Sequence, residues 1–272
     1  MKFILACLLL FLVACESEDV TLAFSTSQED LTYETTATLN AVSLASDSTK
    51  PDNMRTELYL RSKYALISAF DDGSARYEVR LDSVSYSSDK RSVEELGYME
   101  RYIRTQSFQY KIAADGEILA FPSMDDFIPV RGLQDLNIAK LFIKLQPVLP
   151  SKPVSVGESW ERQHAITEGN TQTVVYKNFE LSDVFYRDGD RIAAIKMRLR
   201  YKQNEEDAAF KMESDDFLVG DGTIEFNITD GAVENVSLEV SGKLKVSDKS
   251  EAVKLPDLNV RQTLKMHRIA GE

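Results

Sequence analysis

The sequence predicts an α+β fold that is predominantly antiparallel β, with curved sheets or partial barrels and about two helices packed on them. Three observations lead to this prediction. Apolar and charged residues alternate over long stretches, Asp-Gly pairs separate these stretches, and two segments show helical spacing instead. Strands that alternate in this way bury one face and leave the other in water, which is typical of antiparallel sheets.

The alternation is plainest in the second half of the chain. Residues 236–246 place Val and Leu between Ser, Glu and Lys, with one Gly in the series. Residues 195–202 alternate Ile, Met, Leu and Tyr with Lys and Arg, and shorter runs at 76–81 and 224–228 repeat the pattern. Each run therefore predicts a strand with one apolar and one polar face.

Four Asp-Gly pairs lie between alternating runs, where Gly tolerates the positive φ of a tight hairpin turn. They are Asp72-Gly73, Asp115-Gly116, Asp188-Gly189 and Asp230-Gly231. The first pair of turns maps onto the second with offsets of 116 and 115 residues, and the flanking sequences are similar. Two interpretations stay open: a degenerate duplication into two β-hairpin halves, or hairpins that simply recur at this interval.

Two helices are expected within the first half. Ser92 and Glu95 have the spacing of a capping box, and apolar residues follow at near-helical spacing: Val93, Leu96, Met99 and Ile103. A second helix is expected over about 132–145, with an apolar face that includes Leu133, Leu136, Phe142 and Ile143. Pro147, Pro150 and Pro153 then forbid its continuation, so the segment 146–154 is the predicted connection between the halves.

The first fifteen residues indicate a targeting signal. Lys2 precedes an apolar run that is too short for the ~20 residues of a membrane-spanning helix. Residues 12–15, Leu-Val-Ala-Cys, resemble a bacterial lipobox, which implies cleavage between Ala14 and Cys15 and a lipid on the Cys15 sulfur. Glu16 at the next position implies sorting to the outer membrane, on its periplasmic side or at the surface. A non-lipidated secretory peptide or a buried N-terminal helix is the alternative.

These features divide the chain into four expected parts. They are a lipoprotein signal peptide over 1–14, an acidic tether over 15–30, a β-rich half with two helices over 31–146, and a second β-rich half over 147–272. The net charge of −12 becomes −13 once Lys2 is removed, and such an excess of carboxylates disfavours nucleic-acid binding. After lipidation of Cys15 and loss of Cys7 with the leader, no cysteine is left for a disulfide or a thiol nucleophile.

No residue pattern predicts catalysis, a metal site or a cofactor. His164 and His267 are the only histidines, neither has a partner at zinc-ligand spacing, and both are expected on strands facing water. Acidic clusters at 188–190, 205–207 and 213–216 do not have the spacing of a calcium loop. A hydrolase stays open as a third functional class, but no Gly-x-Ser-x-Gly elbow marks a nucleophile.

The segment Val154-Ser-Val-Gly-Glu-Ser-Trp160 contains the only tryptophan. Together with the lipobox and the hairpin around Gly231, it resembles an uncharacterised family of bacterial secreted and lipid-anchored proteins that repeats a Pro-Val-x-Val-Gly-(Asp/Glu)-(Ser/Thr)-Trp segment. The resemblance covers roughly residues 105–240 and brings no established activity. From the residues themselves, Gly157 is expected to permit a backbone turn and Trp160 to pack as an apolar anchor, with ligand stacking as the alternative.

The expected function is therefore a non-enzymatic envelope lipoprotein, bound to the membrane through Cys15, whose curved sheet holds a lipid-like or other apolar molecule. By analogy of fold alone, this plan resembles bacterial lipoprotein carriers and mycobacterial lipid-binding lipoproteins. The alternative is a structural module with a solid core that contacts other envelope proteins. An empty concavity between sheet and helices would favour the first function, and a packed one the second.

Overall fold

The computed structural model describes most of the chain from residue 19 onward. The described residues are 19–26, 30–43, 53–89, 92–120, 138–168, 171–203, 218–244 and 258–269. Within these ranges the chain forms the strands β1 (Asp30–Ser43), β2 (Asn53–Ala69), β3 (Ala75–Ser88), β4 (Ser107–Ile112), β5 (Ile118–Ala120), β6 (Ser159–Glu168), β7 (Thr171–Arg187), β8 (Asp190–Gln203), β9 (Leu218–Asn227), β10 (Ala232–Leu244) and β11 (Leu258–Ile269), and the helices α1 (Val93–Arg104) and α2 (Ile138–Leu145).

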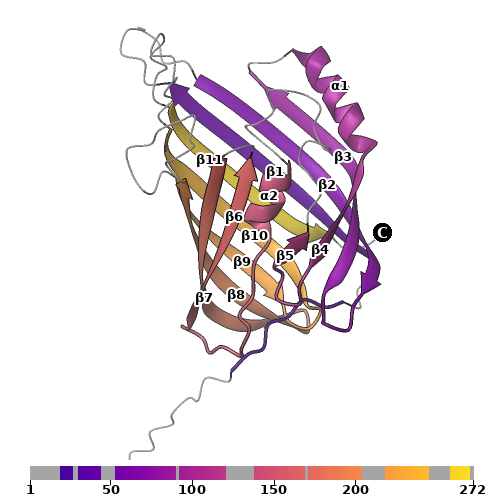
Figure 1. Cartoon of the computed structure of the whole chain (residues 1–272), viewed down its shortest axis with the longest axis vertical. Coiled ribbons are helices and arrows are strands. Elements are labelled where there is room, and N and C mark those ends of the chain that lie inside the picture. The colour runs from indigo at the N-terminus through magenta and orange to yellow at the C-terminus, as the bar shows by residue number, and fades with distance from the viewer. Residues whose placement is uncertain are drawn as a thin grey trace, which may run out of the picture.

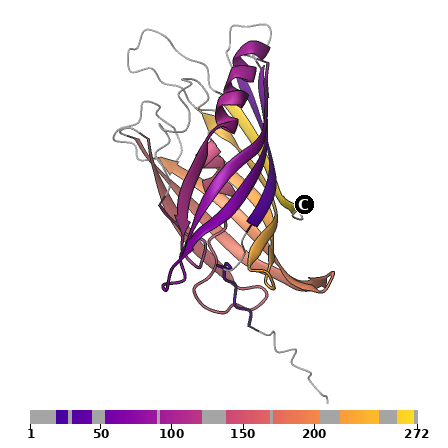
Figure 2. The same ribbon diagram turned by 90° about the vertical axis from the view of Figure 1, so that its right-hand side faces the viewer.

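All of these strands join one curved sheet in the order β5-β4-β3-β2-β1-β11-β10-β9-β8-β7-β6. Neighbouring strands are antiparallel, and the sheet curls around α2 without closing, so β5 and β6 are its edges (Figures 1 and 2). The first and last strands pair at its centre, from Thr32 opposite Ile269 to Ser43 opposite Leu258. The predicted mainly antiparallel α+β fold with about two helices is confirmed.

The concave face carries the core, as the alternation predicts. On β8, Ile195, Met197 and Leu199 are each 2% exposed or less. Lys196 and Arg198 between them point outward to ion pairs on neighbouring strands. Burial of one complete face of apolar side chains is the main source of stability for such a sheet.

Two glycines on the concave face of β9 permit close approach of the next strand. A Cβ on Gly222 would lie 2.5 Å from the Ser237 carbonyl oxygen, and one on Gly220 would lie 2.8 Å from that of Glu239. Any larger residue would push β9 and β10 apart, so these glycines allow the tight curl of the second half.

All four predicted Asp-Gly turns are hairpin turns. Their glycines have φ between +66° and +97°, at Gly73, Gly116, Gly189 and Gly231. They connect β2 to β3, β4 to β5, β7 to β8 and β9 to β10, and all lie at the same end of the sheet. In each of these four hairpins, the second strand lies on the side of the first that faces β5 in the sheet order. The duplication of two halves stays a prediction.

Helix α1 begins at the predicted capping box. Ser92 Oγ accepts from the Glu95 amide at 3.2 Å, and the Glu95 carboxylate accepts from the Ser92 amide at 3.1 Å. Leu96 and Ile103 are buried, but Val93 is 87% exposed, so its expected place on the apolar face is wrong. At about 100° per residue, Val93 points some 60–80° away from the line through the two buried residues.

Helix α2 lies inside the concavity (Figure 1). It is described from Ile138, so the expected start near 132, with Leu133 and Leu136, falls outside the described residues. Leu141 and Leu145 are buried, at 1% and 3% exposure, and Phe142 packs beside them in the same core. Among the described residues, no helix is long and apolar enough to cross a membrane.

The hairpin end of the sheet is covered by two crossing segments, which we call the strap (residues 19–26) and the connector (residues 146–158). Val20 and Val154 exchange backbone hydrogen bonds of 2.8 and 3.0 Å. The Phe24 amide donates to the Ala114 carbonyl at 2.9 Å, and the Leu149 amide donates to the Asp115 backbone carbonyl at 2.7 Å. Strap and connector together form what we call the floor.

Part of the expected acidic tether over 15–30 is packed against the body: residues 19–26 form the strap, whereas 15–18 and 27–29 lie outside the described residues. Val20 and Leu22 are 2% and 3% exposed, and Phe24 packs edge-on against Phe226 at 5.3 Å between ring centroids. Apolar residues at every second position therefore attach residues 19–26 to the body of the protein. The sequence carried this signal in Val20-Thr-Leu-Ala-Phe24, which has the period of a strand.

Candidate functional site

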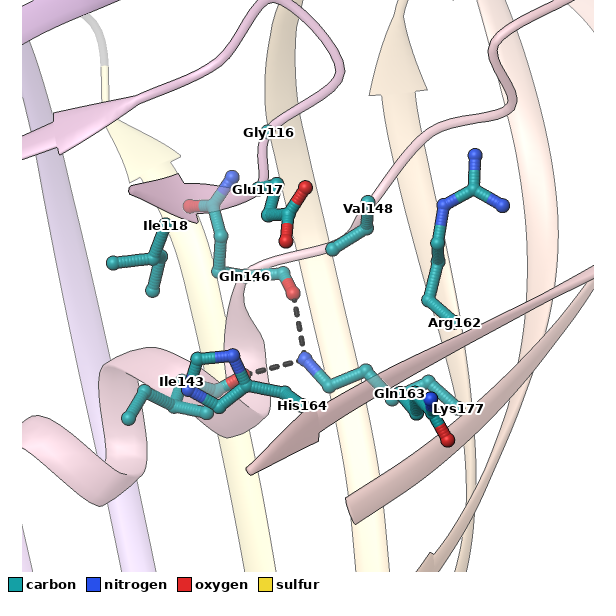
Figure 3. Close-up of a pocket in the computed structure, with 10 residues that line it drawn as sticks. All are labelled: Gly116, Glu117, Ile118, Ile143, Gln146, Val148, Arg162, Gln163, His164 and Lys177. Atoms are coloured by element: carbon teal, nitrogen blue, oxygen red, sulfur yellow. Dashed lines mark hydrogen bonds between the residues drawn. The ribbon is translucent and has the colours of Figure 1, made fainter. Parts of the chain in front are cut away.

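The candidate site is the concave face around α2, where polar groups enter an otherwise apolar interior. Lys177 on β7 occupies an inward position between Val175 and Phe179, and it is 3% exposed. Its Nζ donates to the carbonyl oxygens of Ile143 at 2.5 Å and of Gln146 at 2.8 Å (Figure 3). Ile143 lies in the last turn of α2 and Gln146 directly follows the helix. Carbonyl groups at the C-terminal end of a helix have no partner within the helix and need an outside donor.

Lys177 therefore fixes the C-terminal end of α2 to the sheet. A cation at this end also interacts favourably with the helix dipole. Burial lowers the pKa of the Lys177 amine to about 7, so it loses its proton far more easily than an exposed lysine. A second polar contact anchors the same helix: Lys144 Nζ donates to the buried Gln262 Oε1 on β11 at 2.5 Å.

A small cavity of about 30 Å³ lies beside Lys177, between the two edges of the sheet. The turn into β5 lines one side, β6 lines the other, and the end of α2 lies between them (Figure 3). His164 on β6 lines this cavity, and partial burial lowers its pKa, assisted by the charge on Lys177. The expectation that His164 faces water is wrong, because β6 turns this residue toward the gap between the edges.

A second cavity, of about 40 Å³, lies above the strap among aromatic side chains. It is lined by Tyr33, Tyr64, Tyr77 and Tyr110, together with Phe24 and Phe142. Burial raises the pKa of Tyr64 and Tyr110 well above the usual range, so these phenols stay neutral. Tyr77 OH donates to the Ser25 carbonyl at 3.2 Å, which ties the cluster to the strap.

A larger hollow of about 830 Å³ lies over β6–β10 and is lined mainly by side chains in outward register. Ion pairs of 2.9 Å cross it, from Lys196 to Glu180 and from Arg198 to Asp221. Its charged lining makes it unsuited to an apolar ligand.

The predicted motif residues lie where the connector meets β6. Gly157 adopts a φ of +93°, and its amide donates to the Leu181 carbonyl at 2.7 Å. Trp160 stacks on Phe179 at 5.4 Å between ring centroids, and its Nε1 donates to the Val148 carbonyl at 2.8 Å. Both residues thus lie in the packing of the connector against the sheet.

Other predicted residues are placed as follows. Ala14 and Cys15 lie outside the described residues, as do the acidic clusters at 205–207 and 213–216. His267 is exposed on β11, with its Nε2 3.2 Å from Glu34. Within the described ranges, no cluster of three or more His, Cys, Asp or Glu residues is arranged to hold a metal ion.

Sequence reasoning missed Lys177. A lysine in the inward phase of the alternating run Val175, Lys177, Phe179, Leu181 was a usable signal, because a cation on the apolar face of a strand needs a buried partner. Its partners are backbone carbonyls more than 30 residues away, which no local pattern reveals.

No family model and no curated protein matches the chain. Among solved structures, a lipovitellin structure concerned with lipid–protein interactions is similar with a TM-score of 0.47 and 12% identity, covering 89% of this chain. This chain spans about a quarter (25%) of that lipovitellin chain.

Two further structures are DynF from the dynemicin biosynthesis pathway of Micromonospora chersina and a DUF1329 family protein from Desulfovibrio piger. DynF has a TM-score of 0.21 and 8% identity, covering 93% of this chain and 85% of its own. The DUF1329 protein has a TM-score of 0.16 and 6% identity, covering 89% and 85%. TM-scores below 0.5 do not establish a common fold, so function has to be inferred from the chain's own geometry.

Proposed function

We propose that this chain is a lipid-anchored protein of the bacterial envelope that binds a lipid-like or other apolar molecule on the concave face of its sheet. The observation that carries the proposal is the unclosed, apolar concavity. Its buried lining extends from β4 to β7, and within the described residues α2, the connector and the strap occupy it. Curved sheets of this kind can enclose a hydrophobic ligand when the covering element moves.

Helix α2 is the element that would make room. The cavities beside it, of about 30 and 40 Å³, are far below the ~300 Å³ of a typical small-molecule site. A ligand would therefore replace the contacts of Leu141, Phe142 and Leu145. The hydrogen bonds made by Lys177 and Lys144 hold the helix at two points, and bonds of this kind contribute about 1–3 kcal/mol each net of solvation.

The same small cavities favour the second candidate, a structural module with a solid core. In that case α2 is a permanent part of the core, and the protein acts by contacting other envelope proteins. No reaction is assigned to either candidate, and neither requires a cofactor.

Ligand binding separates the two candidates. Titration of the mature protein with a fluorescent stearate analogue should give saturable binding, and native mass spectrometry should show exchangeable apolar adducts. Leu141→Ala, which loosens α2 on the sheet, should bind the probe more tightly than wild type. Lys196→Ala on the convex face is the matched control and should behave as wild type. Absence of both saturable binding and adducts would leave the solid-core module.

The lipid anchor and envelope location are tested separately. The purified membrane form should carry a diacylglycerol modification on Cys15, seen by mass spectrometry, and Cys15→Ala should move the protein to the soluble fraction. Unchanged mass, processing and fractionation in Cys15→Ala would contradict the anchor, while leaving the ligand question to the titration.

A further inference from the structure

We propose that the floor end of the molecule faces the membrane surface, so that the bilayer holding the anchor contacts the hairpin turns and the connector. This inference rests on the proposed lipid at Cys15. It adds an orientation and a contact surface to the anchor, and it commits to one partner, a zwitterionic phospholipid surface.

The chain between Cys15 and the strap is short, which limits the distance between the anchor and the floor. Val20 is fixed to Val154 by two backbone hydrogen bonds, and Ser155 Oγ donates to the Asp19 carboxylate at 2.5 Å. Four chain steps separate Cys15 from Asp19, and at about 3.8 Å each they allow at most about 15 Å between the two Cα atoms. The 17 residues of β2 span roughly 55 Å in extended form, so the α1 end of the sheet lies far beyond that reach.

The floor and the hairpin turns around it form one connected surface. The Ser25 amide donates to the Gly231 carbonyl, which attaches the strap to the β9–β10 turn. The Arg191 amide donates to Thr229 Oγ1, which joins the β7–β8 hairpin to the same turn. A Cβ on Gly73 would lie 3.2 Å from that of Ala114, so the β2–β3 and β4–β5 turns also touch. The hairpin end therefore meets a bilayer as a unit.

The floor end combines exposed apolar side chains with a neighbouring cation. Three large apolar side chains are exposed at this end: Phe70 at 37%, Val156 at 44% and Tyr186 at 74%. Lys111 Nζ lies 4.3 Å above the Phe70 ring, which places a cation beside an exposed aromatic group. Aromatic and apolar residues with neighbouring cations are typical of the membrane–water interface.

The charge at the turns determines which lipid headgroups this end of the molecule can contact. Aspartates at the turns, including Asp71, Asp115 and Asp188, oppose binding to anionic headgroups. A surface of phosphatidylcholine or phosphatidylethanolamine has no net charge and avoids this repulsion. Without the anchor, three exposed apolar side chains supply too little area for stable binding, so we expect the floor to orient the protein and the lipid to hold it.

The test measures which parts of the lipidated protein approach the bilayer. Because Cys15 would be acylated and Cys7 removed, one introduced cysteine can carry a fluorophore at a defined place. We choose Lys152→Cys on the connector, Ser237→Cys on the convex face of β10 and Tyr98→Cys on α1. The protein is inserted into phosphatidylcholine vesicles whose headgroups carry a nitroxide quencher.

We expect strong quenching of a fluorophore at position 152 and none at position 98. Quenching at position 237 should be nearly as weak as at position 98. Replacement of Phe70, Val156 and Tyr186 by Ser should reduce the quenching at 152 while the protein stays on the vesicles. A ten-residue Gly-Ser insertion between Glu18 and Asp19 should reduce it further, because the anchor then no longer confines the floor.

Equal quenching at all three positions, or strongest quenching at 237 or 98, would overturn the inference for a protein that mass spectrometry shows to be lipidated. A protein that lacks the diacylglycerol would instead contradict the anchor itself. The two failures are thus distinguishable in one preparation.

Discussion

The two halves of the sheet fill the concavity with different chemistry. In the first half, five tyrosines are buried on β1–β4: Tyr33, Tyr64, Tyr77, Tyr86 and Tyr110. In the second half the buried lining is mostly aliphatic, with Phe179 and Phe226, and among the described residues Tyr201 is its one buried tyrosine. Aliphatic side chains need only close packing, whereas each buried phenol also needs a hydrogen-bond partner.

This difference accounts for one of the two small interior cavities, while the other lies beside Lys177 between the edges of the sheet. The 40 Å³ cavity lies among the tyrosines of the first half, next to the strap that supplies a carbonyl to Tyr77. The second half supplies the tightly packed wall, with Phe226 and Leu199 fully buried. The first half is therefore the side on which an apolar molecule would most easily be accommodated.

The largest effect is expected from a cavity in the second half. Phe226→Ala should lower the free energy of unfolding by about 3–5 kcal/mol, because a fully buried ring is removed from a tightly packed wall. Urea denaturation measures this loss. Val219→Ala, at an exposed position on the same strand, is the control and should change stability by less than about 0.5 kcal/mol. A small loss for Phe226→Ala would contradict the tight packing.

A smaller effect is expected where the floor closes over the first half. Gly116 has a φ of +87°, and a Cβ there would lie 2.3 Å from a Phe24 ring carbon and 2.5 Å from the Pro147 carbonyl. Gly116→Ala should therefore destabilise the protein by about 1–3 kcal/mol. Gly189→Ala is a matched control, since Gly189 has a φ of +97° but no neighbour within 4 Å. Equal losses for both variants would mean that the floor contacts contribute nothing.

The contact between Lys177 and α2 predicts that the free energy of unfolding depends on pH. The Lys177 pKa is about 7 in the folded protein and near 10.5 unfolded, so the unfolded state binds more protons between these values and stability rises with pH. Above about pH 10 this gain is opposed, because the buried tyrosines have raised pKa values and the unfolded state then loses protons first.

Lys177→Met should abolish the increase in stability with rising pH that is expected for the wild type. At pH 9 the variant should be about 1–3 kcal/mol less stable than wild type, because the carbonyls of Ile143 and Gln146 lose their donor. At pH 7 the difference should shrink, since the methionine has no buried charge to desolvate. Urea denaturation at both pH values measures the two differences. A pH-independent difference would contradict the buried-amine explanation.

The smallest effect is expected for a single phenol. Tyr77→Phe removes the hydrogen bond to the Ser25 carbonyl and should cost about 0.5–1.5 kcal/mol. Tyr186→Phe, at an exposed position, should leave stability unchanged. If Tyr77→Phe is as neutral as this control, the strap does not depend on the tyrosine cluster.

The features of this fold that the sequence predicts are those that depend on residues close together in the chain. The alternating runs, the four Asp-Gly turns and the capping box at Ser92 each depend on neighbouring residues, and all are present in the structure. The contact of Lys177 with α2 and the crossing of Val20 with Val154 join segments distant in the sequence. Single-sequence patterns carry no pairing information of that kind.

The pairing of β1 with β11 has a consequence for how the chain must be made. Strand β11, which follows all the other described strands in the sequence, lies in the middle of the sheet, so its neighbours β1 and β10 each keep one unsatisfied backbone edge until residue 269 is available. Such long-range closure slows folding and exposes edges that promote aggregation. A polypeptide with this topology gains from a chaperone that shields these edges until β11 has been synthesised.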